Sequence, residues 1–425
     1  HMEEITMNRR IKAAILGAGA RGCGYGMIMN NRPDEYTLTA ACDIAPEQLR
    51  KAKGLLGLSD DMLFHDEESF FAEKRADLLV IATCDKDHVR QCVRAMRLGY
   101  DILLEKPVSD SREELSELLR VQEETGRVVA VCHELRYGYG YEKLSELLTE
   151  GVVGKLIAID AMERVAYWHQ AQAYVRIQYD HRDVACPTIL AKCSHDLDLI
   201  QHYAGSECGT VTSIGGLSFF RIENAPENST ERCLDCSLSE TCVYSAKKIY
   251  INGWKKKGCP EFVWPFNKVS LVKPNTEERL YEGLRTTCFG RCVFRCGFER
   301  DPGVVDHQLV QMNFENGVTA VLKMVLAAEP GRRINLFGST GEILMDERVG
   351  TIEVMPYGGE KRVIDLNTND GHGGGDPKLI EHLYKVLSGE EPNRTSLNES
   401  VECHLIGIAA EESRHSGGEL VKVHG

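Results

Sequence analysis

The sequence predicts an α/β protein with a doubly wound parallel sheet in its first part and a mostly antiparallel sheet in its second. An apolar strand runs directly into a Gly-x-Gly-x-x-Gly turn within residues 11–22, and further apolar runs alternate with helical patterns as far as residue 132. Beyond residue 150, strand-like runs are separated by loops. Because 425 residues are too many for one ordinary core, we expect two domains, at residues 8–145 and 146–425.

The first domain is expected to alternate strands and helices. Helical patterns carry Ser111 and Glu114 in a capping-box arrangement at the start of one segment. Apolar runs that are separated by helices and buried on both faces indicate a parallel, doubly wound sheet. The predicted strands are residues 11–16, 36–42, 78–82, 101–104 and 127–132, and the predicted helices are residues 88–98 and 111–124.

The second domain has a different pattern of predicted elements. Strands are predicted at residues 156–162, 304–314, 319–327 and 334–337, with loops rather than regular helices between them, and helical periodicity returns at 377–387 and 400–415. Residues 220–300 are rich in Cys, Pro, Lys and aromatic residues and show little period. We interpret this segment as an insertion with too few apolar residues for a core of its own.

Composition narrows the class of partner. The net charge of −14 argues against nucleic acid and against anionic membranes, because both attract basic surfaces. No apolar run approaches the roughly 20 residues of a membrane span, and the first strand begins too early to leave room for a signal peptide. We expect a cytoplasmic protein with small-molecule partners.

The glycine-rich turn predicts a dinucleotide site. Gly17 suits the tight turn, Gly19 lets backbone amides approach a pyrophosphate, and Gly22 lets the helix pack closely on the strand. Asp43 closes the next apolar run, about 20 residues on, where it can accept hydrogen bonds from a ribose 2′-hydroxyl and would repel a 2′-phosphate. These features favour NAD over NADP; the alternative is a tight turn without a ligand.

A second candidate segment is Glu105-Lys106-Pro107. It follows a buried strand and therefore falls at the carboxyl edge of the parallel sheet, where doubly wound folds bind ligands. Lys106 can donate a hydrogen bond to a substrate hydroxyl or carbonyl and share in proton transfer. The alternative is a surface lysine before a turn.

The chain resembles the Gfo/Idh/MocA sugar and inositol oxidoreductases over nearly its whole length outside the insertion. The matching residues are Gly17-Ala18-Gly19-Ala20-Arg21-Gly22, Asp43, residues 81–88, Glu105-Lys106-Pro107, residues 134–137, 154–156, 194–198, 337–341 and 411–414. This resemblance implies an N-terminal Rossmann domain, a C-terminal domain with an open-faced mixed sheet, and a nicotinamide between them.

The resemblance also implies roles for single residues. Lys106 would touch the reacting hydroxyl and His195 would relay its proton. Apart from the resemblance, we consider Lys192 and Tyr137 as further catalytic candidates. For the cofactor it implies Gly17, Gly19, Ala20, Arg21, Gly22, Asp43, Thr83, His88, Glu105 and Lys106. Asp196 is a candidate for substrate binding.

One position departs from the family pattern. Many inositol dehydrogenases of the family carry an aspartate four residues before the histidine, whereas this chain has Ala191, followed by Lys192. A second lysine beside the proton relay would lower the pKa of a nearby acid and could hold Lys106 neutral enough to act as a base.

Polar groups outside these motifs are further candidates for a sugar pocket, which needs several convergent donors and acceptors. Asp306 and His307 begin a predicted strand, and His372 lies in a glycine-rich loop before a helix. Structural roles, such as a helix cap, explain such residues equally well.

The cysteines fall into two groups. About half of the sixteen are scattered in apolar segments, where a thiol behaves as a small hydrophobe, and eight lie within about 90 residues around the insertion. Their spacing suits a structural zinc site formed by Cys233, Cys236, Cys242 and one of Cys292 or Cys296. Free thiols, disulfides and, more weakly, an iron–sulfur cluster remain alternatives.

Three functions follow from these residues. The favoured one is an NAD-dependent oxidoreductase acting on a secondary hydroxyl of a sugar, sugar derivative or inositol. Some relatives of the family instead hold NAD tightly and cleave glycosides without net redox change, which needs an extra base such as Lys192 or the Asp306–His307 pair. The third is a non-catalytic, NAD-responsive sensor. An open-faced sheet also predicts a homo-oligomer, a dimer or a tetramer.

Overall fold

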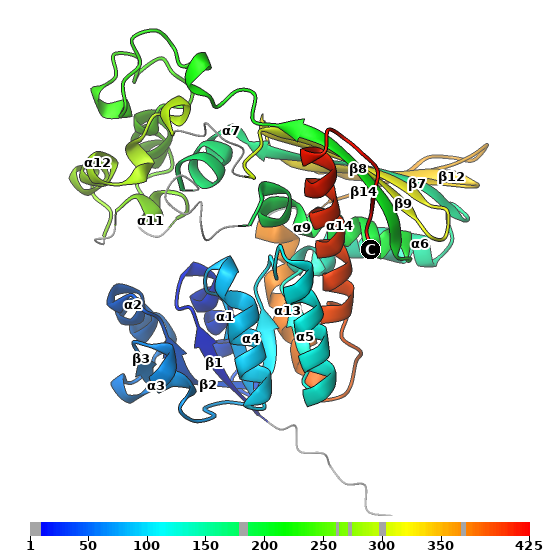
Figure 1. Ribbon diagram of the computed structural model, residues 1–425, viewed down its shortest axis with the longest axis horizontal. Coiled ribbons are helices and arrows are strands. Elements are labelled where there is room, and N and C mark those ends of the chain that lie inside the picture. The colour runs from blue at the N-terminus through cyan, green and yellow to red at the C-terminus, as the bar shows by residue number, and fades with distance from the viewer. Residues whose placement is uncertain (1–9, 178–185, 261–262, 271–273, 297–302, 367–370) are drawn as a thin grey trace, which may run out of the picture.

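The protein is built from two sheets, one above the other, with helices between and around them (Figure 1). This computed structural model describes residues 10–177, 186–260, 263–270, 274–296, 303–366 and 371–425; for residues 371 and 372 it describes the backbone alone. None of the described helices is long and apolar enough to cross a membrane.

The first sheet is parallel throughout and confirms the predicted doubly wound fold. Its strand order is β3-β2-β1-β4-β5-β6, so the order reverses between β1 and β4, the place where such sheets bind ligands. Each of the five predicted strands is present. The strands are β1 Ile11–Leu16, β2 Tyr36–Cys42, β3 Leu63–Phe64, β4 Leu78–Ile81, β5 Asp101–Leu104 and β6 Val129–Val131.

Helices connect these strands and cover the sheet. One half of the predicted capping box is present, because the Ser111 hydroxyl accepts a hydrogen bond of 3.3 Å from the Glu114 amide at the start of α5. The reciprocal bond is replaced: the Ser111 amide donates to the Ser109 hydroxyl at 3.0 Å, and that hydroxyl donates to the Glu114 carboxylate. The helices are α1 Ala20–Asn30, α2 Pro46–Leu56, α3 Glu67–Phe71, α4 His88–Arg97, α5 Arg112–Thr125 and, after β6, α6 Tyr139–Thr149.

The second sheet is mixed and mostly antiparallel, as predicted. Its order is β14-β13-β12-β11-β7-β10-β9-β8-β15, and β7 pairs with β10 in parallel while the other pairs are antiparallel. The strands are β7 Leu156–Ala166, β8 Cys208–Gly216, β9 His307–Phe314, β10 Thr319–Ala328, β11 Gly331–Gly338, β12 Gly341–Asp346, β13 Thr351–Pro356, β14 Arg362–Asp365 and β15 Val421–Lys422.

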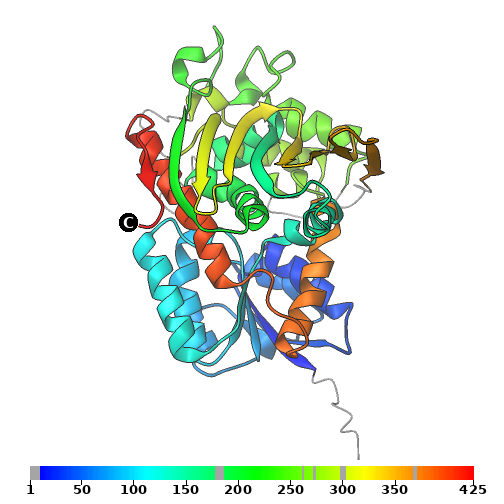
Figure 2. The ribbon, with the colours of Figure 1, turned by 90° about the vertical axis from the view of Figure 1, so that its right-hand side faces the viewer.

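Helices α9 (Thr188–Ala204) and α14 (Leu397–His415) cover the face of this sheet that looks toward the first sheet, while in Figure 1 no described helix lies on the opposite face. The expectation of loops alone between the strands was therefore wrong for α9. Its 17 residues are mostly buried, so the helix lacks the clear division into an apolar and a polar face that identifies a surface helix in a sequence. Figure 2 shows α14 running down from the second sheet beside the first.

Helix α13 (Gly375–Leu387) comes late in the sequence and packs on the first sheet. Its residues Leu379, Ile380 and Leu383 share a core with β1 and β2, and the Tyr36 hydroxyl donates a hydrogen bond of 2.8 Å to the Ile380 backbone oxygen. The chain therefore returns to the first sheet after β14, before it adds the last strand, β15, to the second sheet.

The insertion has a hydrophobic core of its own, which corrects the expectation that it had too few apolar residues. Tyr250, Leu280, Leu284 and Phe294 are buried together in it. Its regular elements are short: helices α10 Gly253–Lys256, α11 Phe266–Val269 and α12 Glu277–Thr286, packed near α7 Tyr167–His169, which follows β7, and further single turns. In Figure 1 the insertion projects to one side of the second sheet.

Candidate active site

The glycine turn lies between β1 and α1, where the strand order of the first sheet reverses. Gly17 has a φ of +92°, and a Cβ there would lie 2.4 Å from the Ala82 oxygen; at Gly22 it would lie 2.1 Å from the Gly17 oxygen. A Cβ on Gly19 would have no atom within 4 Å. The fold therefore needs Gly17 and Gly22, whereas the open space at Gly19 fits a pyrophosphate approaching the N-terminus of α1.

Asp43 lies beside this turn. Its carboxylate accepts hydrogen bonds from the Ala18 amide (2.9 Å) and the Ala45 amide (2.8 Å), which hold it at the carboxyl end of β2. The next side chain, Ile44, is 82% exposed. A carboxylate fixed next to the glycine turn fits a ribose, and the exposed apolar side chain beside it fits the flat face of an adenine. Sequence reasoning missed Ile44, because only its exposure distinguishes it.

Thr83 and His88 lie near the end of β4. The Thr83 hydroxyl donates a hydrogen bond of 2.5 Å to the Gln91 side-chain oxygen, which fixes its orientation. His88 is 1% exposed, and its Nδ1 lies 2.8 Å from the Pro107 oxygen. His88 is therefore a buried support for the turn that carries Lys106, and it does not lie in an open cleft.

Arg21 connects the glycine turn to Glu105. Its guanidinium donates to Glu105 at 2.7 Å and to Asp376 at 2.9 Å, and it also bonds the Tyr25 hydroxyl. Burial opposes ionisation of Glu105, but Arg21 and Lys106 outweigh burial and lower the pKa of the carboxyl. The guanidinium of Arg21 is thus occupied by these carboxylates. One of them, Asp376 at the start of α13, comes from near the C-terminal end of the sequence.

Lys106 contacts the helix that carries His195. Its ammonium donates a hydrogen bond of 3.0 Å to the backbone oxygen of Ala191 in the first turn of α9. His195 follows Ala191 by one helical turn, so the two residues lie on the same side of the helix. His195 is 5% exposed, and its Nε2 lies 3.5 Å from the Glu134 carboxylate. The structure therefore brings the two principal candidates, Lys106 and His195, to one place.

A cavity of about 410 Å³ lies next to this turn of α9. Lys192, the residue after Ala191, lines it together with Glu163 and Arg332. Glu163 bonds both cations at 2.9 Å, and although burial opposes its ionisation, Arg332 and Lys192 lower its pKa. We call this space the reaction cavity. Nothing in the sequence identified Glu163 or Arg332, since they meet only when β7 and β11 pair.

Asp196 lies behind the wall of the reaction cavity rather than in it. Both of its oxygens accept from Arg332, at 2.9 and 3.2 Å. Burial and the neighbouring Glu163 raise the pKa of Asp196 against the opposing effect of Arg332. Its contribution is to hold Arg332 in place.

Other candidates lie away from the reaction cavity. Tyr137 is buried in the core, with its hydroxyl 3.5 Å from that of Thr395. Asp306 accepts hydrogen bonds from the Ser218 amide and from Nδ1 of His307, at 2.8 and 2.7 Å, so it anchors the start of the insertion. Neither Tyr137, Asp306 nor His307 is among the described residues that line the cavity. Lys106 and His195 are not among them either, but Lys106 bonds the turn of α9 whose Lys192 lines the cavity. The His372 side chain lies outside the described residues.

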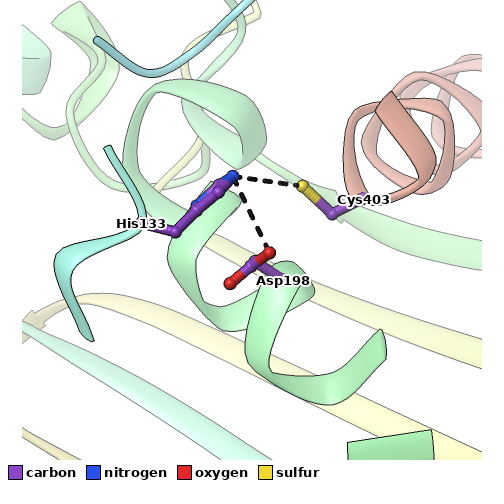
Figure 3. A group of neighbouring side chains, drawn as sticks. All are labelled: His133, Asp198 and Cys403. Carbon is purple, nitrogen blue, oxygen red and sulfur yellow. Dashed lines mark hydrogen bonds and ion pairs between the residues drawn. The ribbon is translucent and has the colours of Figure 1, made fainter. Parts of the chain in front are cut away.

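Behind His195 lies a buried polar cluster formed by His133, Asp198 and Cys403 (Figure 3). Nε2 of His133 is 3.7 Å from Asp198 and 3.9 Å from the Cys403 sulfur. Among the described residues, this is the one group of three potential metal ligands whose ligand atoms all lie within 4.8 Å of one another. However, Arg136 donates to both Asp198 oxygens at 2.7 Å. A cation would have to displace this guanidinium, so the cluster is better explained as a structural support.

Four of the five predicted metal-binding cysteines line one small cavity in the insertion. Its volume is about 20 Å³, and it is bounded by Cys233, Cys236, Cys242 and Cys292. All four are free thiols. Cys296 is not part of this wall; its sulfur donates to the Cys292 backbone oxygen at 3.4 Å. An antiparallel bridge between Arg232 and Arg291 brings the two cysteine segments together.

The fold and this site define a dinucleotide-binding oxidoreductase. The chain matches two family descriptions, the oxidoreductase family's NAD-binding Rossmann fold over residues 11–133 and its C-terminal alpha/beta domain over residues 145–423. The chain therefore belongs to the Gfo/Idh/MocA family of NAD-binding oxidoreductases, as the resemblance implied.

Individual relatives are distant. The chain is 22% identical over 399 residues to YteT of Bacillus subtilis (strain 168), a protein with an oxidoreductase name, covering 87% of this chain and 89% of the relative. It is 27% identical over 160 residues to a glycosyl hydrolase family 109 protein of Solibacter usitatus (strain Ellin6076), covering 35% and 36% of the two chains. A levoglucosan dehydrogenase solved with NADH and levoglucosan shares the fold, with a TM-score of 0.71, 13% identity and coverage of 98% and 100%.

Proposed function

We propose that this protein oxidises or reduces a secondary hydroxyl carbon of a sugar, a sugar derivative or an inositol. The observation that carries the proposal is the hydrogen bond between Lys106 and the Ala191 oxygen. It holds a cationic donor one helical turn from His195. The residue after Ala191, Lys192, lines the reaction cavity, so Lys106 and His195 lie beside this cavity, although neither is among its described lining residues.

The chemistry divides between these side chains. Lys106 donates a hydrogen bond to the substrate oxygen and stabilises the charge that develops on it. His195 accepts the hydroxyl proton, and Glu134, 3.5 Å from its Nε2, stabilises the resulting imidazolium. The glycine turn and Asp43 would hold NAD, which would supply the hydride acceptor for the carbon.

The reaction cavity suits a hydroxyl-rich molecule. Glu163, Lys192 and Arg332 supply acceptors and donors within one wall, and Trp168 supplies an apolar face. Pockets that bind small polar ligands combine apolar walls with a few convergent polar groups. The levoglucosan complex of the distant structural neighbour supports the same class of substrate.

A second candidate is glycoside cleavage without net redox change. Such a cycle needs a base that removes a C–H proton while the aglycone departs with the bonding electrons, followed by addition of water. Lys192 lines the reaction cavity but is ion-paired with Glu163 at 2.9 Å, so it would have to lose its proton before it could serve as that base; the Asp306–His307 pair is not among the described lining residues. The glycosyl hydrolase name of one relative favours retaining this candidate.

One assay separates these functions. Purified protein is incubated with NAD and a panel of free sugars, inositols and aryl glycosides, and NADH absorbance and aglycone release are followed in the same wells. We expect NADH with a free polyol and none with a Lys106→Ala variant. Aglycone release without accumulating NADH would identify the glycosidase, and NAD binding without turnover on any compound would identify a sensor.

We also propose a structural metal ion in the insertion, held by Cys233, Cys236, Cys242 and Cys292, with zinc as the fitting ion. A tetrahedral zinc site has Zn–S bonds of about 2.3 Å and sulfurs about 3.8 Å apart. No three of these thiols lie within 4.8 Å of one another in the described chain, so the ion would draw them inward around the small cavity they share.

Metal analysis of protein purified without chelators tests this second proposal. We expect about one zinc per chain, lost in Cys236→Ser, and unchanged in Cys92→Ser, which removes a buried thiol far from the cavity. Metal-free protein whose insertion resists proteolysis as well as metal-treated protein does would refute it.

We propose that the chain forms a homo-oligomer through the uncovered face of the second sheet. On this face Leu309 and Val321 are only partly buried, although they lie in the middle of their strands. Covering such apolar positions with a second copy removes them from water. Light scattering of Val321→Glu, which places a charge on this face, should show a shift toward the monomer.

A further inference from the structure

A second cavity, of about 620 Å³, lies at the insertion beside the reaction cavity. Trp168 of α7 lines both spaces, so they are neighbours with one aromatic side chain in common. We call this space the side cavity. A ligand long enough to extend from the reaction cavity past Trp168 would enter the side cavity, and none of the catalytic candidates lines the side cavity.

One wall of the side cavity is aromatic. Tyr167, Trp168, Trp264 and Phe266 lie along it. The rings of Trp168 and Trp264 have centroids 5.0 Å apart with planes tilted by 53°, and Trp264 is 40% exposed. An exposed indole on a cavity wall offers a flat apolar surface, which suits the C–H face of a sugar ring.

The lining of the side cavity is also cationic. It carries Lys248, Lys256 and Lys257. The structure gives none of these three an ion pair within the described residues, whereas their neighbour Lys255, outside this lining, pairs with Glu277 at 2.6 Å. In a chain with a net charge of −14, three lysines and no carboxylate among the described lining residues are opposite to the average surface. Such a lining attracts an anion.

We propose that the side cavity binds a carboxylate-bearing sugar unit that is linked to the sugar whose hydroxyl enters the reaction cavity. This inference rests on the proposed function for the identity of the reacting sugar. A uronic acid contacts both kinds of lining residue, because its ring packs on Trp264 and its carboxylate lies against the lysines. The preferred substrate is then an acidic disaccharide or glycoconjugate rather than a free neutral sugar.

Matched ligands test the charge requirement. The protein loaded with NADH is titrated with cellobiose and with cellobiouronic acid, and with methyl β-glucoside and methyl β-glucuronide, which differ in one carboxylate. Binding is followed by tryptophan fluorescence and by calorimetry, since two of the three tryptophans, Trp168 and Trp264, line the side cavity. We expect the acidic member of at least one pair to bind about tenfold more tightly at low salt, with the difference shrinking as salt rises.

Matched variants locate the effect. The double variant Lys256→Gln/Lys257→Gln should abolish the preference for the acidic ligand, and Trp264→Leu should weaken both members of the pair. Lys255→Gln, which removes a neighbouring lysine with a carboxylate partner, should leave the preference unchanged. Equal affinity for acidic and neutral ligands in the wild type, or a preference that survives the double lysine substitution, would overturn the proposal.

These readouts are independent of turnover. If the acidic preference is present but no sugar yields NADH or aglycone, the proposed function fails and the side cavity stands. If neutral sugars are oxidised and the acidic preference is absent, the proposed role of the side cavity is wrong and the proposed function stands.

Discussion

The ammonium of Lys106 donates a hydrogen bond of 3.0 Å to the backbone oxygen of Ala191. The contact joins the turn after β5 in the first sheet to the first turn of α9, which covers the second sheet. Since His195 lies one turn further along α9, the same contact aligns the two halves of the candidate active site.

Removal of this ammonium should stop the chemistry and leave the cofactor site intact. For Lys106→Ala we expect kcat to fall by about 10²- to 10⁴-fold, because a positioned donor and proton-transfer partner is lost. The NAD dissociation constant, measured by calorimetry, should change little. Turnover near the wild-type rate would remove Lys106 from the reaction.

Two glycines of the same turn should respond differently to an added methyl group. Gly17→Ala places a Cβ 2.4 Å from the Ala82 oxygen at a φ of +92°, so we expect loss of soluble protein or a much lower melting temperature. Gly19→Ala meets no atom of the protein, so it should fold normally and bind NAD more weakly. Thermal melting and NAD titration of both variants, side by side, check this contrast.

Asp43 should control the choice between NAD and NADP. Its carboxylate is fixed by the Ala18 and Ala45 amides, and a 2′-phosphate would meet this negative charge. For Asp43→Ser we expect weaker NAD binding and a ratio of NADP to NAD affinity that rises by about tenfold or more. Titration with both cofactors measures the ratio, and an unchanged ratio would contradict the role.

The Arg136–Asp198 pair should be important for stability. Both oxygens of the buried Asp198 accept from Arg136 at 2.7 Å, so Asp198→Ala removes two hydrogen bonds from a buried guanidinium, which keeps its bonds to Glu399 and to the Arg394 backbone oxygen, both at 2.6 Å. We expect a loss of about 3–5 kcal/mol in the free energy of unfolding, measured with denaturant. Glu146→Ala, which breaks an exposed pair with Lys143, is the matched control and should leave the midpoint unchanged.

Acid should destabilise the protein through buried neutral histidines. His404 accepts from the Val108 amide at 2.8 Å and contacts the Ser400 oxygen at 2.6 Å, so its neutral form uses both ring nitrogens. Burial lowers the pKa of His404 to about 3 and that of His133 to about 4, from an ordinary value of 6.5. Between pH 6.5 and about 4 the unfolded chain therefore binds more protons than the folded chain, and stability falls as the pH falls.

Denaturant unfolding at several pH values checks this dependence. Each such histidine contributes a slope of roughly 1 kcal/mol per pH unit in that window. His404→Gln, which cannot take up a proton, should flatten the slope, and substitution of the exposed His65 should not. A slope that is the same in His404→Gln as in the wild type would exclude His404 as a cause.

Local patterns were sufficient for the first sheet and its glycine turn. Alternating apolar runs and helical patterns depend on neighbouring residues, and the requirement for glycine at Gly17 and Gly22 comes from a turn of a few residues. The same holds for the Ser111 cap. The position of Lys106 at the sheet edge followed because it comes directly after β5.

Contacts between distant segments decided the rest. Glu163 and Arg332 line one wall because β7 and β11 are hydrogen-bonded neighbours, although the two residues are 169 positions apart in the sequence. Asp376 reaches Arg21 because α13 returns to the first sheet. Such pairings depend on the free energy of the whole packed core, which no short window of sequence contains; for the same reason only the folded chain excluded Tyr137 and Asp306 from the cavity wall.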